Sequence, residues 1–356
     1  MTPAAISLCD LSADQRDALA ATLSRLTTPF PPDPPAPASP EDGGGIAALV
    51  SAITARPWRR SAVDAATADD IARKVADAVA AGRPLEFSVP FGGYKGWRLA
   101  AFPHADWAEL FWIDYLRRYA ERLAALHAPG VVVTLTCLRG VLGWVNNLRL
   151  ADQDAYLAGL SELLRLRSGP RVALRCLDLT ERLGGPAATL ALLAAREAAA
   201  PAPTPAQLAS AGRNLVRRGG ERDLSGADLS GVDLSGVDLS GVDWPAAVET
   251  AARRCAVMEG LEARRAFNKF GPRIQITHIR GAGLSLHLGS CRSAVAQPWV
   301  STGYLEWRAA EGVWLERLTG GAGSPPGAHA LAVAHPLAGI SPALATLPLV
   351  AGPAPP

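Results

Sequence analysis

The sequence lacks the cysteine spacing of a metal-binding or disulfide-rich protein. No CxxC pair occurs, and an odd number of cysteines is scattered along the chain, at Cys9, Cys137, Cys176, Cys255 and Cys291. Structural zinc sites use closely spaced cysteines, and secreted disulfide frameworks use even sets of them. We therefore expect no metal centre and no disulfide framework.

The sequence also lacks a charge excess and a long hydrophobic run. Its formal net charge is only +2 over 356 residues, so the composition predicts neither a nucleic-acid partner nor a membrane partner. No apolar run reaches the length of about 18 residues that a membrane-spanning helix needs. The first residues lack the basic and apolar regions of a secretory signal. We expect a cytoplasmic protein.

What the sequence does contain is a βαβ unit over residues 83–147. An apolar strand at 85–89, a helix from Asp106 and a β-branched strand at 131–136 follow one another, an order that builds a parallel sheet. Further helices are predicted at 11–27, 46–54, 68–81, 151–166, 187–199, 205–217 and 245–266, and further strands at 171–177, 273–278, 284–288, 303–307 and 313–318. The predicted fold class is α/β, with a Rossmann-like, mostly parallel sheet flanked by helices and with antiparallel C-terminal strands.

The predicted domain organisation has three parts. Residues 1–45 form an N-terminal helix and a Pro-rich linker, and 46–320 form the α/β catalytic domain. Residues 321–356 form a tail rich in Pro, Ala and Gly, most of which is either poorly ordered or loosely draped on the fold. Within the catalytic domain, 222–243 is an insertion whose pentapeptides DLSGA, DLSGV, DLSGV and DLSGV resemble the pentapeptide-repeat pattern. They supply about one turn of a four-sided coil, too little to bury a core. The insertion is either an expanded surface loop or a small docking or DNA-mimicking element.

The first candidate site is the loop that follows the strand at 85–89. Ligands of parallel sheets bind outside the carboxyl ends of the strands. Gly92 and Gly93 let the backbone approach a ligand there, and their N–H groups can bind an anion. Tyr94 and Lys95 follow, and Lys95 would add a cation, a base or an imine-forming amine. The loop is neither GxGxxG nor Walker A, and the alternative is a structural turn with an exposed lysine.

Two further segments are expected at the same edge. The first precedes the helix from Asp106, where Asp106 and Glu109 have the spacing of a capping box, so it is either structural or brings His104 to the site. The second follows the strand at 131–136. It is either structural or offers a cation and amide side chains for an anionic or polar ligand. Its candidate ligands are Arg139, Asn146 and Asn147.

A run of polar and basic residues over 267–307 is the last candidate. Such density within apolar strands fits recognition of a phosphorylated or carboxylated small molecule. His278 is either a half-buried structural histidine or a catalytic one. The candidate residues of this run are Arg273, His278, Arg280, His287, Arg292 and Trp299.

These segments, in this order, resemble the isocyanide (isonitrile) synthases of the pyoverdine and dityrosine biosynthesis type. The resemblance covers roughly residues 80–180 and 245–318, and Lys95, Arg139 and Trp299 match positions of the family's motifs. The segments that carry it are GRPLEFSVPFGGYK, PHADWAE, HAPGVVVTL, DAYLAGLSELL, RIQITHIR and VAQPWVSTGYLEW.

The resemblance implies a Rossmann-like fold and a reaction without metal or other cofactor. Family members condense the α-amine of an amino acid, typically tyrosine or tryptophan, with the carbonyl of ribulose 5-phosphate and fragment the sugar to leave an isonitrile. The expected partners are therefore an amino acid and a sugar phosphate, with a homodimer as a possible assembly. This chemistry needs anion clamps and an acid/base. The expected catalytic residues are Lys95 and His278, and the candidate clamps are Lys95, Arg139, Arg273, Arg280 and Arg292.

Two other functions stay open from the sequence. The same fold could serve a small-molecule transferase or cyclase with another donor, such as S-adenosylmethionine, although no Gly-rich strand-to-helix loop with a downstream acidic residue is present. The chain could also be a non-catalytic interaction protein that docks through its pentapeptide segment.

Overall fold

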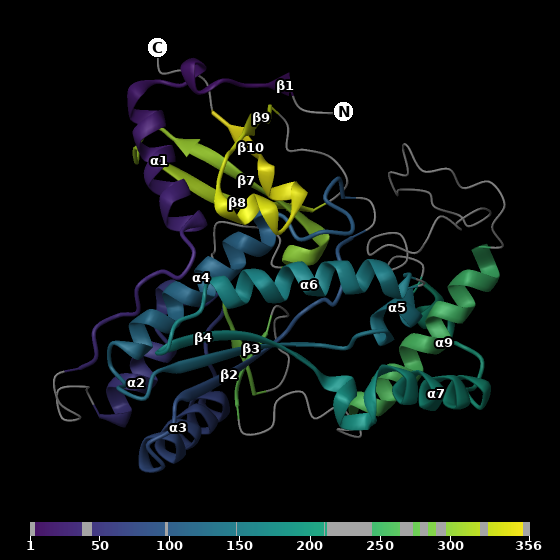
Figure 1. Cartoon of the computed structure of the whole chain (residues 1–356). Helices are drawn as coiled ribbons and strands as arrows, with labels where there is room; N and C mark the ends of the chain where they lie inside the picture. Colours follow the sequence, from purple (N-terminus) through teal and green to yellow (C-terminus); the bar gives the residue numbers. More distant parts are fainter. Residues whose placement is uncertain are drawn as a thin grey trace.

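Two five-stranded sheets with a buried helix between them make up the architecture (Figure 1). The computed structural model describes residues 4–37, 45–96, 99–146, 148–209, 211, 244–263, 273–277, 284–289, 297–320 and 327–351. The insertion at 222–243 lies outside these residues. Among them, no helix is both long enough and apolar enough to cross a membrane.

The first sheet is entirely parallel and has the strand order β4-β3-β2-β5-β6. Its members are β2 (Leu85–Pro90), β3 (Val131–Cys137), β4 (Val172–Asp178), β5 (Ile274–Thr277) and β6 (Leu286–His287). The predicted α/β class and parallel sheet are confirmed. The prediction that the strands near 273–278 and 284–288 are antiparallel is wrong, because β5 extends the free edge of β2 in parallel and β6 extends β5.

The second sheet is mixed and joins the two ends of the chain. Its order is β1 (Ala4–Ala5), β9 (His329–Ala332), β10 (Thr346–Val350), β7 (Ser301–Arg308) and β8 (Val313–Gly320). The predicted antiparallel hairpin of β7 and β8 is confirmed. The predicted poorly ordered tail is wrong for residues 327–351, which supply β9 and β10 and bury Leu331, Leu344, Leu347 and Leu349.

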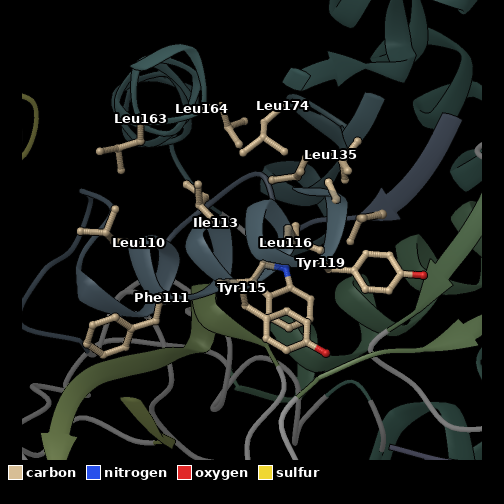
Figure 2. Close-up of a cluster of buried hydrophobic side chains, with 14 of the residues drawn as sticks. Leu110, Phe111, Ile113, Tyr115, Leu116, Tyr119, Leu135, Leu163, Leu164 and Leu174 are labelled. Atoms are coloured by element: carbon tan, nitrogen blue, oxygen red, sulfur yellow. The ribbon is translucent and has the colours of Figure 1, made fainter. Parts of the chain in front are cut away.

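Helix α4 (Trp107–Ala124) is the centre of the molecule, since it packs on β3 and β4 on one side and on β7 and β8 on the other. Fifteen of its 18 residues are buried, as expected for a helix that is covered all round. Figure 2 shows Leu110 and Ile113 of this helix pointing toward Leu163 and Leu164. The second sheet approaches α4 closely at Gly303, where an added Cβ would lie 2.4 Å from the Ala108 nitrogen.

An ion network on α4 fastens the N-terminal segment to the core. The buried Asp114 carboxylate binds Arg25, Arg118 and Arg167. Nearby, Arg117 donates to the carbonyls of the Pro-rich linker and to the carboxylate of Asp33. Because Asp114, Arg117 and Arg167 are buried, these charges need their partners, and the network fixes the linker on the body of the protein.

Most predicted helices are present. They are α1 (Ala13–Thr27), α2 (Ile46–Ile53), α3 (Ala65–Ala80), α6 (Leu150–Leu166), α7 (Gly185–Ala198) and α9 (Trp244–Ala263). A short helix that was not predicted, α5 (Val141–Asn146), lies in the segment that follows β3. It starts at the carboxyl end of β3 and shapes the edge of the sheet.

Candidate active site at the carboxyl edge of the parallel sheet

The carboxyl ends of β2, β3 and β4 meet at one edge, because all three strands are parallel and in register. The loop after β2 crosses the end of β3, so that a Cβ added to Gly93 would lie 3.7 Å from that of Cys137. The candidate residues of the loop after β2 and those of the segment after β3 are thus brought to the same edge. This edge is the candidate active site.

The loop after β2 is covered by Trp299 from the 3₁₀ helix η4 (Pro298–Val300). The indole meets the Phe91 ring edge-on, with centroids 4.8 Å apart, and the Gly96 amide donates to the Trp299 carbonyl at 2.7 Å. A Cβ on Gly92 would lie 2.4–2.5 Å from the indole carbons. The glycine therefore permits the close approach of Trp299.

Lys95 is fully buried, with 1% of its surface exposed, so the alternative of an exposed lysine is wrong. Its Nζ lies 2.8 and 3.0 Å from the two Glu109 oxygens and 3.0 Å from Asp106 Oδ1. It also donates to the carbonyls of Pro298 at 3.2 Å and Ser301 at 2.9 Å. The three N–H groups of Lys95 thus contact five oxygen atoms. Through these contacts the ammonium group connects the loop after β2, the start of α4 and the segment that contains Trp299.

Glu109 is the second centre of this network. Its carboxylate accepts from the Tyr156 hydroxyl at 3.0 Å and from the Asp106 amide at 2.8 Å, and the predicted capping box at the start of α4 is confirmed. Burial raises the pKa of Glu109 to about 8, with the charge of Asp106 adding to the effect and that of Lys95 opposing it. One buried cation faces two carboxylates here, which favours retention of a proton on Glu109 near neutral pH.

Arg139 follows β3 and lies at the same edge. Its Nε and Nη2 bind the two Asp154 oxygens at 2.6 and 2.9 Å, and its amide donates to Asp178 Oδ1 at 3.3 Å. The side chain is 39% exposed, so a ligand can reach it. Its pKa is raised, chiefly by the hydrogen bond to Asp154.

Cys137 and Cys176 lie side by side just below this edge, with sulfur atoms 3.7 Å apart. Both are free thiols. In the part of the chain that the structure describes, no three His, Cys, Asp or Glu side chains are grouped so that they could hold a metal ion.

Arg273 is not brought to this edge. It precedes β5 and its Nε binds Glu86 at 3.1 Å near the start of β2, at the opposite end of the strands. A cavity of about 60 Å³ lies at that amino end, and its lining includes Arg73, Arg83 and Ile274. Arg273 therefore cannot share a small ligand with Arg139.

Two of the candidate histidines, His104 and His287, are among the described residues. His104 is half-buried in the turn before α4, where its amide donates to the Ala101 carbonyl at 2.7 Å. His287 ends β6, opposite Thr277, and its carbonyl accepts from the Arg60 amide at 2.7 Å. Asn146 is the last residue of α5. Four candidates lie outside the described residues: Asn147, His278, Arg280 and Arg292.

Sequence reasoning missed several residues that shape this edge. Asp154, Tyr156 and Asp178 each contact a predicted residue or its partner. Tyr156 lies within the DAYLAGLSELL segment, so the resemblance contained a signal for it. Asp178 directly follows the predicted strand at 171–177 and is the last residue of β4, so the rule that ligands bind beyond the carboxyl ends of parallel strands was the available signal for it.

Three comparisons place the chain among known proteins. The family model described as pentapeptide repeats (8 copies) matches residues 223–243, in agreement with the predicted resemblance of that segment. No curated protein sequence matches the chain. Among solved structures, the chain is similar to the PvcA protein from Pseudomonas aeruginosa, with a TM-score of 0.52 and 17% identity over 78% of this chain and 93% of that one. At this identity the likeness establishes a shared fold, which extends over most of both chains.

Proposed function

We propose that the protein is a biosynthetic enzyme of the isonitrile-synthase type, which condenses the amine of an amino acid with the carbonyl of a sugar phosphate. Two independent lines support the proposal. The sequence carries the ordered segments that resemble this family, and the fold is similar to that of PvcA over most of the chain.

The observation that carries the proposal is the convergence of these segments on one buried network. Lys95 comes from the GGYK segment, Glu109 from DWAE, and Tyr156 from DAYLAGL. The carbonyls of Pro298 and Ser301 come from the PWVS segment. Segments that share only a core would pack through apolar side chains, whereas these four meet through hydrogen bonds to two ionisable groups at the ligand-binding edge of the sheet.

The chemistry requires proton transfers during imine formation and sugar fragmentation. Glu109 has a pKa of about 8, so it can hold or release a proton near neutral pH. Lys95 keeps the Glu109 carboxyl in place, because its ammonium group binds Glu109 and Asp106. We propose Lys95 and His278 as the catalytic residues, with Arg139 as an anion ligand.

Mass spectrometry of the purified protein with ribulose 5-phosphate and a pool of amino acids tests the function. We expect an isonitrile, or the formamide formed from it by hydrolysis, and its mass identifies the amino acid. Absence of any product, together with no thermal shift from ribulose 5-phosphate, would contradict the proposal. The same protein would then be screened with nucleoside donors such as S-adenosylmethionine.

A further inference from the structure

A group of polar side chains at the ends of β3 and β4 has hydrogen-bonding capacity that the described part of the protein does not use. Asp178 accepts the Arg139 and Thr180 amides with Oδ1, at 3.3 and 3.0 Å. Its Oδ2 is buried and has no hydrogen-bond donor among the described residues. A buried carboxylate oxygen without a donor is costly, so it indicates a group that binds there.

Neighbouring side chains show the same feature. Thr180 and Gln153 are both completely buried, and within the described residues Thr180 Oγ1 and Gln153 Nε2 have no hydrogen-bond partner. Gln153 Oε1 accepts the Gly140 amide at 2.9 Å, next to the amide that Asp178 accepts. Unused polar atoms therefore flank the Arg139–Gly140 turn on both sides.

The charges at this place favour a cation. The Arg139 guanidinium interacts with the carboxylates of Asp154, Asp178 and Glu181. A phosphate at Asp178 Oδ2 would be repelled by that carboxylate, whereas an ammonium group would be attracted. The predicted use of Arg139 as a phosphate clamp is therefore less favourable than its use for a group that carries both signs.

Arg139 also retains capacity for one anionic oxygen. Its Nε and Nη2 are committed to Asp154, and Nη1 has no acceptor among the described residues. An amino acid carries its ammonium and its carboxylate on the same carbon. It could therefore place the ammonium at Asp178 Oδ2 and one carboxylate oxygen at Arg139 Nη1.

We propose that Asp178 and Arg139 form the recognition site for the ammonium and carboxylate groups of the amino-acid substrate, with Asp178 selecting the ammonium. This inference rests on the proposed function, which requires an amino acid at this edge. It assigns the amino acid to the β3–β4 side of the edge, and it excludes the phosphate of the second substrate from the same position.

Asp178→Asn is the test variant, because asparagine keeps the acceptor for the two amides and preserves the N-cap of the short helix that follows. It replaces Oδ2 by an N–H donor that repels an ammonium. Asp152→Asn is the matched control, since Asp152 lies on α6 and binds the exposed Arg149 at 2.8 Å. Circular dichroism establishes that both variants are folded.

Titration calorimetry compares L-tyrosine with tyramine, which lacks the carboxylate, and with 3-(4-hydroxyphenyl)propionate, which lacks the amine. L-Tryptophan and its two matched analogues serve if wild type prefers them. We expect Asp178→Asn to weaken the amino acid and the amine by about tenfold to a hundredfold, the range for one charge-assisted hydrogen bond. Binding of the propionate and of ribulose 5-phosphate stays unchanged, and Asp152→Asn resembles wild type throughout.

Unchanged binding of the amino acid by Asp178→Asn overturns the inference, and so does a loss confined to ribulose 5-phosphate, which would make Asp178 a ligand of sugar hydroxyls. Failure of wild type to bind either amino acid also overturns it. Binding that depends on Asp178, without an isonitrile product in the mass-spectrometric assay, supports the inference and removes the proposed function. The two failures are thus distinguishable.

Discussion

At the scale of single residues, the candidate site depends on buried charges whose partners come from distant parts of the sequence. The spacing of Asp106 and Glu109 predicts a capping box, which the structure confirms. The same spacing does not reveal that Glu109 also binds Lys95 and Tyr156, because those contacts form only when the strands and helices pack. Local patterns predict local hydrogen bonds, while burial of the lysine is a property of the tertiary structure.

Glu109 gives a pH-dependent contribution to stability. Its folded-state pKa of about 8 lies above the ordinary value of 4.5, so this contribution is fully present below about pH 4.5 and is lost as the pH rises toward 8. We expect thermal unfolding at pH 5, 7 and 8.5 to show that Glu109→Gln destabilises the protein by several degrees at pH 5 and by less at pH 8.5.

Glu162→Gln provides the control for this measurement. Glu162 is paired with Arg165 at the surface, and its pKa is lowered by that hydrogen bond, so it stays ionised over the whole pH range tested. A constant difference between wild type and Glu109→Gln at all three pH values would contradict a raised pKa of Glu109.

Replacement of Lys95 separates its structural role from a chemical one. Lys95→Met leaves two buried carboxylates without their cation, and removal of one partner of a buried pair costs about 3–5 kcal/mol. The double variant Lys95→Met with Glu109→Gln removes one of these charges, so urea unfolding should show recovery of part of that loss. Lys95 has a chemical role if Glu109→Gln alone keeps turnover while the double variant recovers stability but not turnover. Recovery of both by the double variant would assign Lys95 to positioning alone.

At the scale of elements, the loop after β2 shows which parts of the site the sequence could predict. A glycine pair after a strand predicts close approach to the backbone, and the structure shows that Trp299 makes that approach at Gly92. Trp299 was a candidate from the sequence, but its contact with Gly92 could not be predicted, because η4 lies about 200 residues further along the chain. Helix α4 is buried on nearly all sides, including Arg117, because two sheets rather than one pack on it.

The two glycines of this loop should respond differently to alanine. A Cβ at Gly92 would overlap the Trp299 ring at 2.4 Å, whereas a Cβ at Gly93 meets Cys137 at an ordinary 3.7 Å. Gly92→Ala should therefore lower stability by about 1–3 kcal/mol and shift the tryptophan fluorescence. Gly93→Ala is its matched control and should change neither. Equal free energies of unfolding of the two variants in urea would show that Trp299 does not pack against Gly92.

At the scale of the whole molecule, strands β1, β9 and β10 of the second sheet are the part that sequence reasoning missed. The strand β10 contains Pro348, which argues against a strand with neighbours on both sides, yet β10 lies between β9 and β7. Its pairing with β7 involves Leu349 and Val350, so the proline stands just before that ladder and costs no hydrogen bond there. Composition alone predicted disorder because the segment is short of charge and rich in Pro and Gly.

Truncation measures how much this sheet contributes. A variant that ends at residue 326 loses Leu331, Leu344, Leu347 and Leu349, all at most 4% exposed. Each buried leucine contributes about 1.5–3 kcal/mol, and their sum approaches the total stability of a typical domain. We expect this variant to lose cooperative thermal unfolding, whereas one that ends at Ala351 should unfold like the full chain. If both truncated variants unfolded cooperatively at the wild-type temperature, residues 327–351 would contribute no stability, as expected of a poorly ordered tail.

The position of α1 has a consequence for the order in which the protein forms in the cell. This helix leaves the ribosome long before β8 is synthesised, yet its apolar residues Leu19 and Leu26 are buried in a core completed by α4 and β8. Until then α1 exposes an unpartnered apolar face, and the nascent chain depends on protection of that face to avoid aggregation.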